Sequence, residues 1–123
     1  MPKLSDLDAR LLRYERRDVG TFLPHVDRIE DAQGVSFLCP LCFAKNGGKV
    51  GTHSVICWSR SRGVPEDAQP GPGRWKLSGT RIDDLTLNGD VTPDGKGLQS
   101  RSVQLLGEGG CKWHGYVTNG EAA

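Results

Sequence analysis

The sequence predicts a mainly β protein, a small β-sandwich or partly open barrel with one short helix. Three observations predict this fold class. Short runs rich in β-branched and aromatic residues recur along the 123-residue chain, with turn-forming residues between them. Gly is abundant, at 17 residues, and apolar residues make up only 36% of the chain. The expected fold is therefore rich in loops and has a modest core, which a metal cross-link would stabilise.

We expect a single domain built from two parts. Residues 1 to 33 carry much of the charge and no Cys, and they predict N-terminal strands and a short helix packed on the core. Residues 34 to 121 contain all four Cys and predict a metal-binding β-domain. At this length, one hydrophobic core is the ordinary expectation.

The N-terminal part predicts two strands and the one helix. Residues 9 to 16 (ARLLRYER) favour a strand because Tyr14 extends an alternating pattern, and residues 21 to 23 favour a second. Residues 27 to 33 predict the helix, which Asp27 can cap at its start. The glycine that follows this segment can end the helix.

The second part predicts the remaining strands. Residues 53 to 58 (HSVICW) form the clearest one, because they are rich in β-branched and aromatic side chains. A short apolar strand at residues 35 to 38 runs directly into Cys39, and a glycine-rich turn follows at residues 46 to 51. Further strands are expected at residues 74 to 78, 84 to 87, 102 to 106 and 112 to 118.

Two segments predict loops and one predicts a turn. Residues 65 to 73 contain three prolines and predict a surface loop, and the polar residues 88 to 101 predict another. Asn119-Gly120 is a hairpin turn signal. Only three residues follow it, so the second strand of such a hairpin is expected to be nearly absent.

Charge and hydropathy restrict the classes of partner and compartment. The net charge of +1 arises from 16 basic and 15 acidic residues, so a nucleic-acid partner or an acidic membrane is not expected. The first 20 residues are highly charged, and no apolar stretch is long enough to span a bilayer. We therefore expect a cytoplasmic protein, in a compartment where Cys residues bind metals more often than they form disulfides.

The strongest motif is Cys39-Pro40-Leu41-Cys42. Two thiolates separated by two residues can turn toward one tetrahedral ion. The alternative is a redox pair, which needs a helix after the motif to lower a thiol pKa. We find no helix signal after Cys42, so the sequence favours metal binding.

A second pair with the same spacing, Cys111 and His114, lies near the C-terminus. Glycines on both sides let the backbone curl tightly around an ion. Together with Cys39 and Cys42, this pair predicts a Cys₃His site that holds one Zn²⁺ per chain. Such a zinc-stabilised fold would tie the middle of the chain to its end.

His53 is the alternative ligand. It begins a strand after the glycine-rich turn and can reach the ion, and if it replaces Cys111 the site becomes Cys₂His₂. Of the two histidines, we expect His114 rather than His53 to bind the ion. Cys57 stands in an apolar run and is interpreted as a small buried hydrophobic residue, while His25 is interpreted as a surface residue.

No motif indicates catalysis. The chain has no HExxH sequence and no serine in a nucleophile elbow. Glu108, close to Cys111, lies in a glycine-rich loop, which is a poor place for a preorganised base. The side chains of Trp58, Trp75 and Trp113 are expected to anchor the core.

Five segments extend over roughly residues 34 to 121: VSFLCPLCF, GTHSVICW, GRWKLSGT, DDLTL and GCKWHGYVTNG. Together they resemble the domain of unknown function 6527 family of small bacterial and phage proteins. The positions that recur in the family correspond to Cys39, Cys42, His53, Trp75 and His114. In the commonest family form a Cys directly precedes the final His, whereas Trp113 holds that place here. The resemblance implies a metal site and a phage or prophage origin, and it implies no particular activity.

The function that the sequence favours is a small zinc-binding, non-enzymatic protein-interaction module. Its partner is expected to be a protein, bound through exposed loops such as residues 65 to 73. One alternative is a zinc-dependent hydrolase with an open metal site, because His53 and His114 are both available. The other is a nucleic-acid-binding zinc domain, against which the balanced charge argues.

Overall fold

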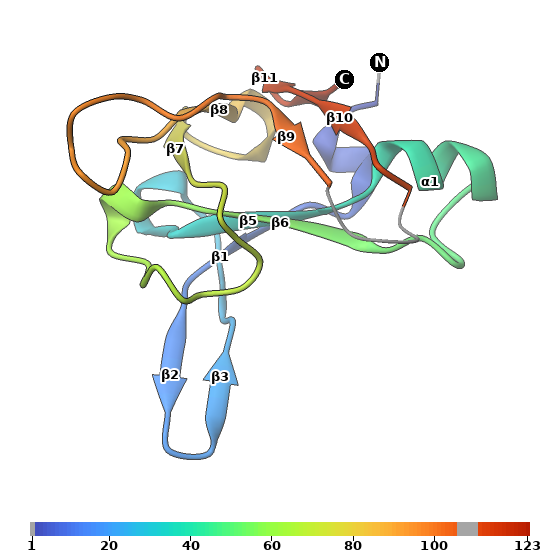
Figure 1. Cartoon of the computed structure of the whole chain (residues 1–123). Helices are drawn as coiled ribbons and strands as arrows, with labels where there is room; N and C mark the ends of the chain where they lie inside the picture. Colours follow the sequence, from blue (N-terminus) through green and yellow to red (C-terminus); the bar gives the residue numbers. More distant parts are fainter. Residues whose placement is uncertain (1, 106–110) are drawn as a thin grey trace.

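A four-stranded antiparallel sheet runs across the middle of the molecule (Figure 1). We describe residues 2 to 105 and 111 to 123 from a computed structural model. The order of strands across the sheet is β4-β1-β5-β6, so β6 is an edge strand. The strands are β1 (Arg10–Leu12), β4 (His25–Val26), β5 (Gly34–Leu38) and β6 (Ser54–Trp58).

Alternating apolar residues determine which face of this sheet is buried. In the β5–β6 pair, Val35 lies opposite Cys57 and Phe37 lies opposite Val55. All four side chains are almost completely buried in the main core. Because side chains alternate along a strand, a shift of one residue would expose this set, which fixes the register.

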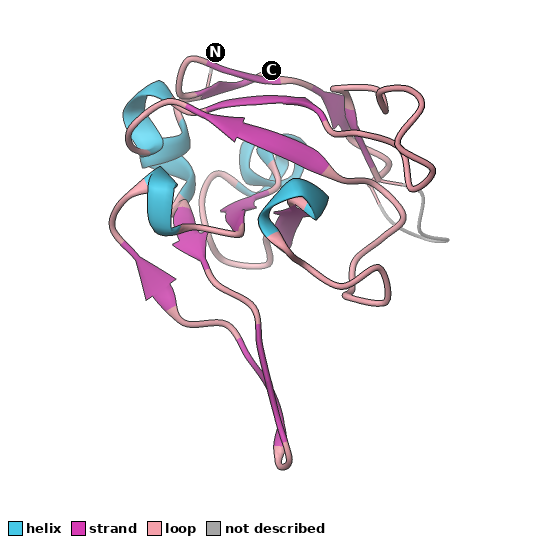
Figure 2. Ribbon diagram, turned by 90° about the vertical axis from the view of Figure 1, so that its left-hand side faces the viewer, coloured by secondary structure: helices cyan, strands magenta, loops and turns pink. Residues whose placement is uncertain are grey.

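Small two-stranded sheets cover the buried face (Figures 1 and 2). Their inward side chains include Leu77, Leu87, Val103 and Val117, which join the main core. These strands are β7 (Trp75–Ser78) paired with β8 (Thr86–Gly89), β9 (Val103–Gln104) with β10 (His114–Gly115), and β11 (Val117–Thr118) with β12 (Glu121–Ala122). The predicted mainly β fold class with one short helix is confirmed.

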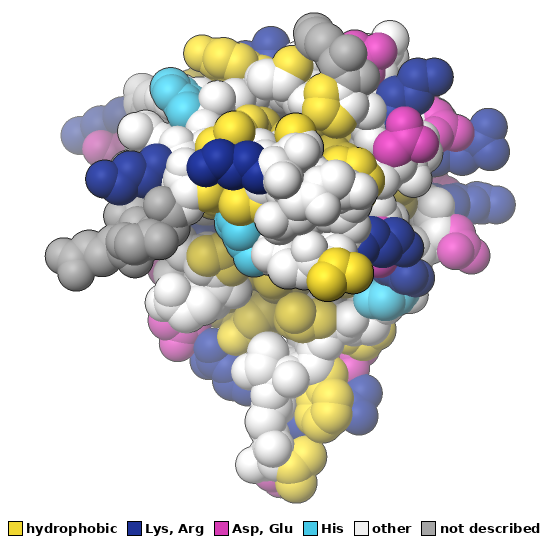
Figure 3. Space-filling view, turned by 90° about the vertical axis from the view of Figure 1, so that its right-hand side faces the viewer, with side chains coloured by type: hydrophobic (Ala, Val, Ile, Leu, Met, Phe, Trp, Pro, Cys, Tyr) yellow, Lys and Arg dark blue, Asp and Glu magenta, His cyan; other side chains and the backbone are white. Residues whose placement is uncertain are grey.

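A hairpin projects from the body of the protein (Figure 3). It consists of β2 (Glu15–Arg17) and β3 (Gly20–Phe22). The predicted strand at residues 9 to 16 is therefore divided between the four-stranded sheet and this hairpin. Val19, at the turn, has 85% of its surface exposed.

The position predicted for the helix is wrong. The α-helix α1 spans Pro40–Asn46, and residues 27 to 33 contain only a single 3₁₀ turn, η2 (Ile29–Asp31). Pro40 stands in the first turn, where its fixed φ suits a helix, and Gly47 ends the helix with a φ of 68°. The other 3₁₀ turns are η1 (Leu4–Leu7), η3 (Arg60–Arg62) and η4 (Ile82–Asp84).

Tertiary contacts explain why residues 27 to 33 do not form an α-helix. The backbone N–H of Gln33 donates to the Leu12 carbonyl, and its side chain accepts a hydrogen bond from the Tyr14 N–H. Ile29 is buried in the main core. The segment is thus drawn into the sheet, and these contacts outweigh its local helix signals.

The C-terminal hairpin is more complete than predicted. Asn119 and Gly120 both have positive φ, at 48° and 79°, as a two-residue hairpin turn requires. The short strand β12 follows, and the Ala122 N–H also donates to the carbonyl of Pro2. The two ends of the chain therefore lie side by side (Figure 2). No helix in the described part of the chain is long and apolar enough to cross a membrane.

Candidate metal centre

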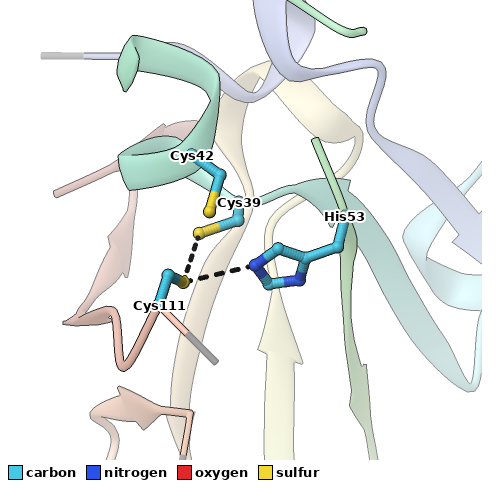
Figure 4. Close-up of side chains that lie close together, drawn as sticks. All are labelled: Cys39, Cys42, His53 and Cys111. Atoms are coloured by element: carbon cyan, nitrogen blue, oxygen red, sulfur yellow. Dashed lines mark hydrogen bonds between the residues drawn. The ribbon is translucent and has the colours of Figure 1, made fainter. Parts of the chain in front are cut away.

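Four side chains from distant parts of the chain converge on one point (Figure 4). They are Cys39, Cys42, His53 and Cys111, and each offers a sulfur or ring-nitrogen ligand atom. These four atoms all lie within 4.8 Å of one another. This Cys₃His group can hold a metal ion.

The junction of β5 and α1 positions the first two ligands. Cys39 follows the last residue of β5 and caps α1, and Cys42 lies in the first turn of that helix. The Cys39 side chain therefore stands at the N-terminal end of α1, where the backbone N–H groups of Leu41 and Cys42 act to lower the pKa of its thiol.

Strand pairing positions His53. The Cys39 N–H donates to the His53 carbonyl over 2.9 Å, which continues the β5–β6 ladder by one step. His53 therefore stands directly opposite Cys39, and its ring reaches the same point as the Cys39 sulfur. The register that buries the core face of the sheet thus also sets this pair of ligands.

A tight turn before β10 positions Cys111. Lys112 adopts a left-handed φ of 55°, which turns the chain sharply between Cys111 and Trp113. The Trp113 side chain is buried and packs edge-on against the ring of Phe37, with 6.0 Å between centroids. The carbonyl of Trp113 accepts a hydrogen bond from the N–H of Leu105, the residue after β9, so the turn is held on two sides.

The thiols of the group differ in acidity. Burial, aided by the hydrogen bond with Cys111, raises the pKa of Cys39 to about 11. Burial also raises the pKa of Cys42. At Cys111 burial acts in the same direction, but hydrogen bonds from His53 and from the Trp113 backbone outweigh it and lower the pKa to about 6. Around neutral pH, Cys111 is therefore the thiolate of the group when no metal is bound.

Short contacts join the group. The Cys111 sulfur lies 3.3 Å from the Cys39 sulfur and 3.2 Å from Nε2 of His53. Cys39 is completely buried, whereas His53 is exposed at the edge of the group. The centre thus has a buried side toward the core and an accessible side at His53.

Of the two histidines that the sequence predicts as candidate ligands, the structure brings only His53 into the group. His53 belongs to the group together with Cys111, so these residues are not alternatives to each other. His114 does not belong to it: the side chain is exposed on β10, and its ring centroid lies 6.3 Å from that of Tyr116. Neighbouring strand residues face opposite sides, and since Trp113 faces the core, His114 faces outward.

Other residues interpreted from the sequence lie as follows. Cys57 is completely buried in the main core, and burial raises the pKa of its thiol, which confirms its interpretation as a small hydrophobic residue. His25 is exposed, also as predicted. The Trp58, Trp75 and Trp113 side chains are buried, with at most 8% exposed. Glu108 lies outside the described residues.

The prediction that no helix follows the first cysteine pair is wrong. A helix does follow Cys39, because α1 begins at Pro40. The distinction between redox and metal chemistry therefore depends on the other two members of the group. A dithiol pair needs no third thiol and no imidazole, whereas His53 and Cys111 complete a set of four metal ligands.

Comparisons of the chain with protein-family models, curated proteins and solved structures find no match. The resemblance to the domain of unknown function 6527 family therefore stays a prediction from the motifs.

Proposed function

We propose that the chain is a zinc-stabilised, non-enzymatic protein-interaction module that binds one Zn²⁺ through Cys39, Cys42, His53 and Cys111. The observation that supports this most is the convergence of these four ligand atoms, all within 4.8 Å of one another. Structural zinc sites are four-coordinate and tetrahedral, and three Cys with one His is one of their common ligand sets.

The spacing of the ligand atoms supports zinc. In a tetrahedral site with Zn–S distances of about 2.3 Å, ligand atoms lie about 3.5–3.8 Å apart. The contacts of Cys111 with Cys39 and His53, at 3.3 and 3.2 Å, are close to this spacing. Small movements of the side chains would bring all four atoms to bonding distance. Soft thiolates also favour zinc over magnesium or calcium.

A hydrolytic function receives less support. A catalytic zinc keeps one position open for water and uses three protein ligands. Here His53 occupies the fourth place beside the three thiols. The exposed His114, which the hydrolase alternative needed near the ion, lies outside the group.

The proposed partner is a protein. The balanced charge of 16 basic and 15 acidic residues favours neither a polyanion nor an anionic membrane surface. Three thiol ligands suit the reducing cytoplasm of a bacterium or of a phage-infected host cell. A phage or prophage origin rests on the motif resemblance alone.

Metal analysis of matched variants tests the zinc proposal. We expect about one zinc per purified chain by mass spectrometry, and loss of bound zinc in His53→Ala. The matched control is His114→Ala, a histidine variant outside the group, which should keep its zinc. Equal loss from both variants, or a parent chain without metal, would contradict the proposal.

Recovery of partners tests the interaction. Zinc-loaded chain should retain a defined set of proteins from bacterial lysate, and the same chain with residues 65 to 73 replaced by a Gly/Ser linker of equal length should retain fewer of them. Identical sets from both baits would contradict binding through this loop.

A further inference from the structure

A pocket of about 580 Å³ opens beside the metal centre. Two of the proposed metal ligands, His53 and Cys111, line one end of the pocket. Val55 and Trp75 belong to its apolar lining, and Pro72 belongs to the loop on one side. This volume is typical of sites that bind small molecules or short peptide segments. The loop proposed above as a partner-binding element is thus one wall of this pocket.

The free edge of the four-stranded sheet runs along the pocket. β6 is the edge strand, and its residues Ser54 and Ile56 line the pocket. In an antiparallel ladder the backbone groups of successive residues point alternately toward the partner strand and away from it. Since the His53 carbonyl accepts the Cys39 N–H, the N–H and C=O groups of Ser54 and Ile56 point away from β5.

These outward groups have no hydrogen-bond partner among the described residues. Unpaired groups along an exposed strand edge are a template on which an extended chain can add as a further strand. Two donors and two acceptors of this kind, spaced two residues apart, match the hydrogen-bonding groups of a β-strand backbone.

Apart from the proposed metal ligand Cys111, the side chains around the pocket are uncharged. Among its described lining residues there is no Lys, Arg, Asp or Glu, and the polar ones are Ser and Gln, together with His53. Phosphate groups and carboxylate ligands are usually bound by Arg or Lys, so this lining favours a neutral ligand. The buried ring of Trp75 offers a flat apolar surface to a side chain of that ligand.

The walls of the pocket are held in place by two hydrogen-bonded side chains. Arg74 is 1% exposed. Its guanidinium donates to the carbonyls of Pro65, Ala68 and Pro70 in the loop. The indole N–H of Trp75 donates to the Arg101 carbonyl over 3.2 Å. A preformed site of this kind loses little conformational entropy when a ligand binds.

We propose that this pocket binds an uncharged, extended peptide segment of the partner protein, which adds as a strand to the free edge of β6. Ser54 and Ile56 supply the backbone hydrogen bonds, and the apolar part of the pocket lining contacts the segment's side chains. The proposal rests on the interaction function above and names the site and the ligand class for it.

Selection from a phage-displayed library of random seven-residue peptides, panned against the zinc-loaded chain, tests this proposal. The enriched peptides are then synthesised and methylated at one backbone nitrogen at a time. Methylation of alternate nitrogens should weaken binding about tenfold, because each removes a donor to the strand edge. Methylation of the intervening nitrogens should change binding little. This measurement leaves the fold of the protein untouched.

A pair of protein variants supplies the reciprocal test. Ile56→Pro removes an N–H that points away from β5 and should weaken the same peptides about tenfold, while Ile56→Val keeps this donor and should bind normally. Zinc content shows whether each variant is folded. Unchanged binding to Ile56→Pro, an N-methyl profile without a period of two, or no enriched peptides would overturn the proposal.

Three further outcomes separate this proposal from others. A dimer of the chain in sedimentation experiments that Ile56→Pro dissociates would assign the edge to a second copy and overturn peptide binding. If zinc content and lysate partners persist while the pocket variants bind all peptides normally, the pocket assignment fails and the interaction function stands. Absence of zinc from the parent chain overturns the proposed function itself.

Discussion

His53 Nε2 lies 3.2 Å from the Cys111 sulfur, although 58 positions separate the two residues in the sequence. This contact joins the β5–β6 hairpin to the C-terminal segment that contains β10. The strands between them form the layer over the four-stranded sheet, so one ion at this point would connect both layers of the fold. A link across so long a stretch of chain removes much freedom from the unfolded state.

The four Cys should divide into three ligands and one core residue. We expect Cys39→Ala to lose bound zinc and most of its folded stability. Cys57→Ala should keep about one zinc per chain and lose about 1 kcal/mol of unfolding free energy, as expected for a small cavity in the core. Metal analysis and urea denaturation measure both effects. Zinc loss in Cys57→Ala would show that the ligand set is wrong.

The Cys111 thiol should be the most reactive one in the metal-free protein. Its pKa of about 6 makes it a thiolate at pH 7, while the pKa of about 11 keeps Cys39 protonated. Brief treatment with iodoacetamide followed by peptide mass spectrometry should find Cys111 modified first. Bound zinc should protect it. Faster modification of Cys39 than of Cys111 would refute this order of acidity.

Zinc binding at pH 8 should release about two protons, because two of the three thiols are protonated beforehand. The pKa values of Cys39 and Cys42 are raised, and that of Cys111 is lowered. Because protons compete with the metal, affinity should rise with pH, by about a hundredfold per unit near pH 8. Calorimetry in buffers of different ionisation enthalpy counts the protons. Release of three would mean that Cys111 is also a thiol.

Replacement of Arg74 should loosen the loop that forms one wall of the pocket. Its guanidinium donates to the carbonyls of Pro65, Glu66, Ala68, Pro70 and Gly73. We expect Arg74→Met to lower the unfolding free energy by about 3 kcal/mol, because the carbonyl groups lose their donors. Arg28→Met is the control, since the Arg28 side chain is 73% exposed, and it should change stability little. Equal effects in urea denaturation would contradict this role.

The fold class was predictable because it follows from composition and local patterns. Alternating apolar residues and turn signals indicated most of the strands, and these patterns act over a few neighbouring residues. The helix was misplaced for two physical reasons. Contacts of Gln33 with Leu12 and Tyr14 override the local helix signals before β5. Pro40 and Gly47 are a helix start and a helix stop, but their CxxC and glycine-rich surroundings are equally typical of a metal-binding turn.

The ligand set was harder to predict because it depends on pairing between strands. Cys39 and His53 meet only because the β5–β6 register places them opposite each other. Cys111 and His114 have the same spacing as Cys39 and Cys42, which suggested that both bind the ion. However, Trp113 faces the core, so the next residue, His114, faces outward. Burial of Trp113 was the signal that could have excluded His114.

Zinc X-ray absorption of the purified chain tests the central claim most directly, because it counts the atoms bound to the ion. Coordination by Cys39, Cys42, His53 and Cys111 predicts a first shell of about three sulfurs at about 2.3 Å and one nitrogen at about 2.0–2.1 Å. The shell should be unchanged in His114→Ala. A shell with an oxygen ligand, with two sulfurs, or with a nitrogen that disappears in His114→Ala would contradict it.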